Sequence, residues 1–75
     1  MNINFLHSAD YAITIHFVDG YQLDYAEWNG HFTNLQDAID MGMYILRYVY
    51  PDSATDVEIY NATTGEIFAE IEQNE

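Results

Sequence analysis

The chain has 75 residues, of which thirteen are Asp or Glu, one is Arg and none is Lys, so its formal net charge is −12. Because proteins bind phosphate groups through Lys and Arg, this balance excludes nucleic acid and anionic membrane as direct ligands. The chain also has no Cys, which excludes a disulfide framework and a thiolate metal site.

The composition predicts one small folded domain that spans residues 1–75. Apolar and aromatic residues make up 49% of the chain and include seven Tyr, four Phe and one Trp, which supply large buried areas. No apolar run approaches the ~20 residues that span a bilayer. The N-terminal residues lack the basic region of a signal peptide. We therefore expect a cytoplasmic protein.

The first predicted hairpin covers Tyr11 to about Trp28. Residues 11–17 alternate between apolar and polar types, which is the period of a half-buried strand. Asp19 and Gly20 form a turn signal between two alternating runs. The second strand is expected to run from Tyr21 to about Trp28. Its predicted inward residues are Tyr21, Leu23 and Tyr25.

A helix is predicted to begin at a capping box formed by Thr33 and Gln36 and to end at Tyr50, before Pro51. Gly42 lies in its apolar stripe and is interpreted as the point of closest approach to the sheet. The expected buried stripe consists of Leu35, Ala38, Ile39, Gly42, Ile45, Leu46 and Val49. The expected exposed face carries Asp37, Asp40, Tyr44 and Tyr48.

A second hairpin follows, with alternating strands on either side of residues 63–65. Ile67, Ala69 and Ile71 are predicted to face inward, and the residues between them outward. The element order ββαββ predicts an α+β fold, a four-stranded antiparallel sheet with one helix packed on one face. Ile3 and Phe5 are candidates for an additional short edge strand.

Acidic residues are expected to gather on the outer face of this sheet. Alternate residues of a strand lie about 6.6 Å apart and neighbouring strands about 4.8 Å apart, spacings that resemble those of charges along a nucleic-acid backbone. The alternative is an ordinary solvated face, but such a surface normally mixes both signs of charge. The candidate partner-binding residues are Asp24, Glu58, Tyr60, Phe68, Glu70 and Glu72.

The exposed helix face provides a second candidate surface, formed by Asp37, Asp40 and Tyr44. Acidic residues near a helix N-terminus complement the helix dipole and need no partner there. Two tyrosines on a solvated face, Tyr44 and Tyr48, nevertheless favour a contact surface. For Arg47, an intramolecular role is the preferred interpretation.

No pattern in the sequence indicates catalysis, a metal site or a cofactor. His7, His16 and His31 lack the spacing that places two ligands on one face of a helix. Ser8 and Ser53 have no recognisable His and acid partners. We therefore expect a protein that is not an enzyme.

In size, charge, absence of Lys and acidic outer face with Tyr60 and Phe68, the chain resembles small phage-encoded inhibitors of host defence. This class includes anti-CRISPR proteins and anti-restriction DNA mimics. The resemblance rests on shared physical properties, so no residue role transfers by alignment. It implies a stoichiometric inhibitor in the host cytoplasm that occupies the DNA-binding groove of a CRISPR effector.

Two other functions fit the same sequence. One is an immunity-like or antitoxin-like inhibitor of a basic nuclease. The other is an acidic adaptor or structural interaction domain, whose acidity would be an adaptation to a salty cytoplasm. The expected oligomeric state is a monomer or a weak homodimer. A face-to-face dimer through Tyr60 and Phe68 is disfavoured because the neighbouring carboxylates would repel each other.

Overall fold

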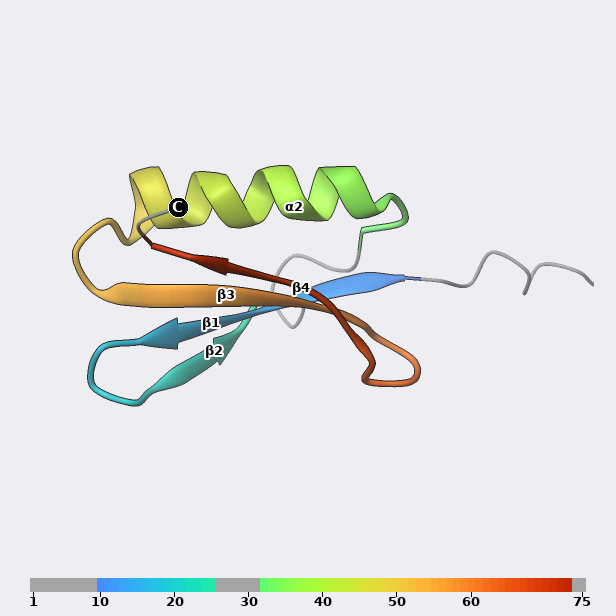
Figure 1. Cartoon of the computed structure of the whole chain (residues 1–75), viewed down its shortest axis with the longest axis horizontal. Coiled ribbons are helices and arrows are strands. Elements are labelled where there is room, and N and C mark those ends of the chain that lie inside the picture. The colour runs from blue at the N-terminus through green and yellow to red at the C-terminus, as the bar shows by residue number, and fades with distance from the viewer. Residues whose placement is uncertain (1–9, 26–31, 74–75) are drawn as a thin grey trace, which may run out of the picture.

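The computed structural model describes residues 10–25 and 32–73 of the chain. One helix lies across one face of a four-stranded antiparallel sheet, which confirms the predicted ββαββ arrangement (Figure 1). No helix in the described ranges is long and apolar enough to cross a membrane. The elements are β1 (Tyr11–Phe17), β2 (Gln22–Asp24), α2 (Leu35–Tyr44), the π-helix η2 (Ile45–Val49), β3 (Ala54–Asn61) and β4 (Ile67–Glu72).

The strands lie side by side in the order β2-β1-β3-β4, so the two hairpins meet through β1 and β3. Glycines in the left-handed region make the turns of both hairpins, Gly20 with φ 90° and Gly65 with φ 83°. Asn61 supports the second turn, because its side-chain oxygen accepts hydrogen bonds from the backbone N–H groups of Thr63 and Thr64. Both predicted turns are therefore confirmed.

The core forms between the helix and the central strands, where the predicted alternation holds. Ile13 and Ile15 of β1 and Val57 and Ile59 of β3 are completely buried. Full burial of an aliphatic side chain of this size stabilises a fold by about 1.5 to 3 kcal/mol. These strand residues pack with Ala38, Ile45, Leu46 and Ala54.

The second strand is shorter than predicted and begins one residue later. Its described residues Leu23 and Tyr25 pack against the core, as expected. Tyr21 does not join the core as predicted, although its ring contacts that of Phe17 with centroids 5.7 Å apart. Its side chain is 60% exposed because Tyr21 belongs to the turn, where its backbone carbonyl accepts from Phe17. The rest of the predicted strand and the proposed edge strand at Ile3 lie outside the described residues.

The helix begins one residue later than the predicted capping box. Asn34 is the N-cap, and its Oδ1 accepts from the backbone N–H groups of Gln36 at 2.8 Å and Asp37 at 3.4 Å. The prediction of Thr33 as the cap is therefore wrong. Asn is at least as good an N-cap as Thr, and here it satisfies two of the free N–H groups of the first turn.

The last turn of the helix also departs from the prediction. Tyr50 N–H donates to the carbonyl of Ile45, a five-residue step that widens the helix into a π turn. The extra residue rotates Val49 out of the buried stripe, so that 47% of it is exposed, contrary to the prediction. Tyr50 takes the inward place instead and packs edge-on against Phe17, with ring centroids 5.0 Å apart.

A bulge in β4 changes the expected direction of two side chains. Ile59 pairs with Ala69, but Tyr60 pairs with Ile67, so Phe68 is an extra residue on its strand. Directly paired residues share a face, which places Ile67 beside Tyr60 on the face away from the helix. Ile67 is 51% exposed. The predictions that Ile67 faces inward and Phe68 outward are therefore wrong.

Candidate partner-binding surface

The face of the sheet that the helix leaves uncovered carries two rows of polar residues. One row crosses all four strands and consists of Asp24, Thr14, Glu58 and Glu70. The neighbouring row consists of Gln22, His16, Asp56 and Glu72. The strands thus bring five carboxylates to one surface, the acidic sheet face, formed by Asp24, Asp56, Glu58, Glu70 and Glu72.

The buried residues of the same strands fix this placement. Val57 and Ile59 are completely buried, so Asp56 and Glu58, which alternate with them, must project on the opposite side. A shift of one residue in the strand register would bury the carboxylates of Asp56 and Glu58 and expose Val57 and Ile59. The core therefore positions the acidic sheet face.

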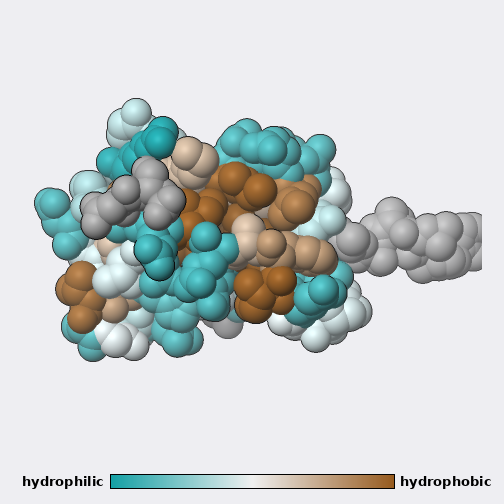
Figure 2. Space-filling view, viewed as in Figure 1, coloured by the Kyte–Doolittle hydropathy of each residue, from teal (hydrophilic) through white to brown (hydrophobic). Residues whose placement is uncertain are grey.

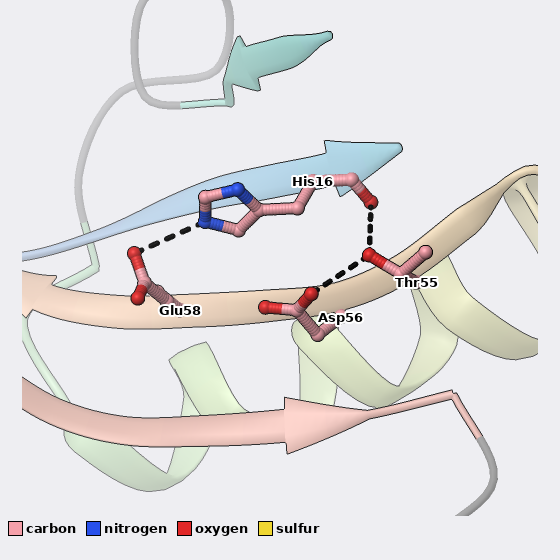
Figure 3. Close-up of polar contacts among 4 residues, drawn as sticks. All are labelled: His16, Thr55, Asp56 and Glu58. Atoms are coloured by element: carbon pink, nitrogen blue, oxygen red, sulfur yellow. Dashed lines mark hydrogen bonds and ion pairs between the residues drawn. The ribbon is translucent and has the colours of Figure 1, made fainter. Parts of the chain in front are cut away.

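The acidic sheet face contains one basic side chain among the described residues, His16. Its Nε2 lies 3.1 Å from Oε1 of Glu58 on the neighbouring strand (Figure 3). Beside this pair, the Thr55 hydroxyl lies 2.8 Å from Oδ1 of Asp56 and 3.3 Å from the backbone carbonyl of His16. His16 thus contacts Glu58, and the Thr55 hydroxyl contacts Asp56.

Glu70 shows that the charges on this face are not balanced. Although its side chain is exposed, desolvation by its neighbours raises the pKa of the Glu70 carboxyl above its usual range. Repulsion from Asp56, a hydrogen bond with Asp56, and repulsion from Glu58 and Glu72 raise that pKa further. Each of these causes disfavours the ionised carboxylate. The folded protein therefore holds these acids closer together than their charges favour.

The two aromatic residues predicted for this face are both engaged within the protein. The half-buried Tyr60 reaches across the sheet, and its hydroxyl donates to Oδ2 of Asp24 at 3.1 Å. The ring of Phe68 packs edge-on against Tyr11, with centroids 5.1 Å apart. Tyr11 belongs to the residues that pack on the core, so Phe68 does not join the carboxylates. Phe68 is therefore absent from the uncovered face, where the exposed Ile67 lies beside Tyr60 instead.

The second predicted surface lies on the exposed side of the helix. Asp37, Asp40 and Tyr44 are exposed there, as expected. The rings of Tyr44 and Tyr48 contact each other with centroids 5.2 Å apart, and Gln36 donates to Oδ1 of Asp40 at 3.0 Å. A shallow hollow is lined by Asp40, Met43, Tyr44, Arg47 and Tyr48.

The helix separates the predicted residues into two groups. It covers the inner face of the sheet, so the helix surface and the acidic sheet face lie on opposite sides of the molecule (Figure 1). A single flat partner surface cannot contact both. The sheet side holds the larger group of carboxylates, and we take it as the candidate site.

Two residues of the acidic sheet face, Asp56 and His16, are missing from the predicted set. The signal for Asp56 was present in the sequence, because it precedes Glu58 and Tyr60 in one alternating run. Its position between His16 and Glu72 depends on strand order, which the sequence does not specify.

Comparisons with known proteins add no further residue to this surface. No family model matches the chain, and no curated protein or solved structure matches it. Within the described ranges, no group of three or more His, Asp or Glu side chains is placed to hold a metal ion. The candidate surface is therefore defined by its geometry and charge.

Proposed function

We propose that the protein is a non-catalytic, stoichiometric inhibitor whose acidic sheet face occupies the basic nucleic-acid-binding site of a partner protein. The observation that supports this most directly is the gathering of five carboxylates on one uncovered sheet face. In the proposal, these carboxylates take the place of phosphates against Lys and Arg in a CRISPR effector or a nuclease. The protein would act as a monomer in the cytoplasm of the host cell.

The electrostatic state of the free protein supports this role. Repulsion within the face raises the pKa of Glu70, and the described residues supply only one imidazole to offset it. Lys or Arg side chains from a partner would relieve that repulsion on binding. A net charge of −12 also steers the protein toward a basic site, so association should be fast and sensitive to salt.

One observation favours an adaptor function as the second candidate. Tyr44 and Tyr48 are 53% and 70% exposed beside the hollow on the helix surface. Tyrosine is enriched in protein–protein interfaces, so this surface suits a partner that is not a nucleic-acid-binding protein. In that case the acidic sheet face would remain in solvent.

The test is a competition experiment with a panel of purified CRISPR effectors and nucleases. Each is bound to fluorescent DNA, the protein is titrated in, and DNA release is recorded at 50 and 300 mM NaCl. We expect one target to release DNA at near-stoichiometric protein, with weaker competition at the higher salt concentration. DNA binding that stays undisturbed across the panel would overturn the proposal in favour of the adaptor.

Two matched variants identify the surface that acts. Glu58→Gln/Glu70→Gln/Glu72→Gln removes three charges from the acidic sheet face. Asp37→Asn/Asp40→Asn/Glu66→Gln removes three exposed charges outside it. We expect the first variant to lose competition and the second to keep it. The opposite result would assign binding to the helix side. Circular dichroism confirms that both variants are folded.

A further inference from the structure

Among the residues that the structure describes, strand β4 ends the sheet, and no other strand pairs with the backbone groups of its outer edge. Gln73 N–H donates to the carbonyl of Thr55 at 2.9 Å, which fixes the hydrogen-bond pattern between β3 and β4. Along an antiparallel ladder, hydrogen-bonded residue pairs alternate with pairs that are not hydrogen-bonded. Ile71, two residues before Gln73, is therefore hydrogen-bonded to β3, whereas the backbone N–H and C=O groups of Glu70 and Glu72 point outward. This edge can accept a further strand.

The side chains along this edge form an alternating pattern. Glu70 and Glu72 belong to the acidic sheet face, whereas Ala69 and Ile71 lie on the helix side and are partly buried. Figure 2 shows hydrophobic side chains gathered over β4 and the adjoining side of the helix. A small hollow there is lined by Met43, Leu46, Arg47, Ile71, Glu72 and Gln73.

We propose that the partner contributes an extended segment, with Lys or Arg alternating with apolar residues, which adds to β4 as a fifth strand. Main-chain hydrogen bonds to Glu70 and Glu72 would hold the segment, and alternate side chains would give specificity. Its cationic side chains lie beside the two carboxylates, and its apolar side chains face the hollow at Ile71. The inference rests on the proposed function, because it specifies how a basic partner engages the acidic sheet face.

The charge of the edge argues against a second copy of the chain as the occupant. Antiparallel pairing of β4 with itself would bring Glu70 and Glu72 against the same residues of the other copy. Like charges on adjacent strands are destabilising. Each copy also carries a net charge of −12, so the two molecules repel before contact. A cationic segment meets neither obstacle.

The test uses two synthetic peptides of identical composition, one alternating (Lys-Val-Lys-Val-Lys-Val-Lys) and one in blocks (Lys-Lys-Lys-Lys-Val-Val-Val). Amide hydrogen exchange of the protein is followed by NMR with each peptide at saturation. We expect the alternating peptide to slow exchange at Glu70 and Glu72 by about tenfold or more, because those N–H groups gain partners. The blocked peptide should leave both rates unchanged.

A proline variant provides an independent readout of the edge. Glu70→Pro removes the outward N–H, at a position where an edge strand tolerates proline. Glu70→Gln loses the same charge and keeps the N–H. We expect the proline variant to bind the alternating peptide at least tenfold more weakly than the glutamine variant does. If the proline variant fails to fold, the exchange experiment on the natural sequence still tests whether a strand adds to β4.

The outcomes separate the two proposals. Equal binding of both peptides, without protection of Glu70 and Glu72, would overturn strand addition and leave binding by the acidic sheet face intact. Binding of neither peptide at low salt would contradict both proposals. Protection of the two amides by raising the protein concentration alone would identify a second copy as the occupant and overturn the inference.

Discussion

At the scale of single residues, Glu70 links the charge of the acidic sheet face to the stability of the fold. Its pKa is raised in the folded protein, so ionisation costs more there than in the unfolded chain. The stability linked to Glu70 is fully present below the unfolded pKa and is lost as the pH rises through the raised folded pKa. Glu70→Gln should therefore stabilise the protein at pH 7 and lose this advantage toward pH 4.

The measurement is the urea midpoint of unfolding between pH 4 and pH 8 for both proteins. Glu66→Gln provides the control, because it removes the same charge from an exposed residue in the turn before β4. If Glu66→Gln stabilises the protein as much as Glu70→Gln does, the effect comes from net charge and not from the neighbours of Glu70.

Where the alternation of apolar and polar residues along a strand was unbroken, the sequence was enough to predict which side chains lie on the acidic sheet face. Glu58, Glu70 and Glu72 were placed correctly because Glu58 alternates with buried residues on its strand, and Glu70 and Glu72 alternate with partly buried ones. Phe68 was misplaced because a bulge adds a residue to one strand without any sign in its composition. Asp24 was placed on the correct face, but its contact with Tyr60 spans two strands and depends on their order.

At the scale of elements, Gly42 sets the distance between the helix and the sheet, as its position in the stripe predicted. A Cβ added there would lie 2.9 Å from Cγ2 of Val57 and 3.4 Å from Cδ1 of Ile71. Alanine would gain about 1 kcal/mol in helix propensity. Overpacking a core costs about 1 to 3 kcal/mol, and the buried, β-branched Val57 has little freedom to move.

We therefore expect Gly42→Ala to lower the free energy of unfolding by about 1 kcal/mol, measured by urea denaturation. A double-mutant cycle supplies the control. In a Val57→Ala background, where the contact is relieved, the same substitution should become neutral or stabilising. A gain in stability from Gly42→Ala in the natural sequence would show that the helix is free to move away from the sheet.

The helix also shows why its two ends were less predictable than its middle. Thr33 and Asn34 are both good N-caps, and the choice between them depends on backbone geometry that residue type does not encode. At the other end, a regular helix keeps Val49 in the buried stripe. The π turn favours Tyr50 instead, because its ring packs against Phe17 from a distant strand.

At the scale of the whole molecule, self-repulsion from the net charge of −12 destabilises the folded state, and strand pairing concentrates this repulsion on the acidic sheet face. Glu58 lies directly opposite Glu70, and Asp56 directly opposite Glu72. Like charges in directly opposed positions destabilise a sheet. If this repulsion is the cost of a surface built for a basic partner, screening it with salt should stabilise the free protein.

We expect the Tm at pH 7 to rise by a few degrees between 10 and 150 mM NaCl, because the Debye length falls from about 30 Å to about 8 Å over this range. Differential scanning calorimetry measures the change. Glu58→Gln/Glu70→Gln/Glu72→Gln should show a clearly smaller rise than Asp37→Asn/Asp40→Asn/Glu66→Gln, although both lose three charges. An equal response from the two variants would mean that the repulsion is spread over the whole surface and does not mark the acidic sheet face. A Tm that falls as salt is added would contradict net self-repulsion in the folded state.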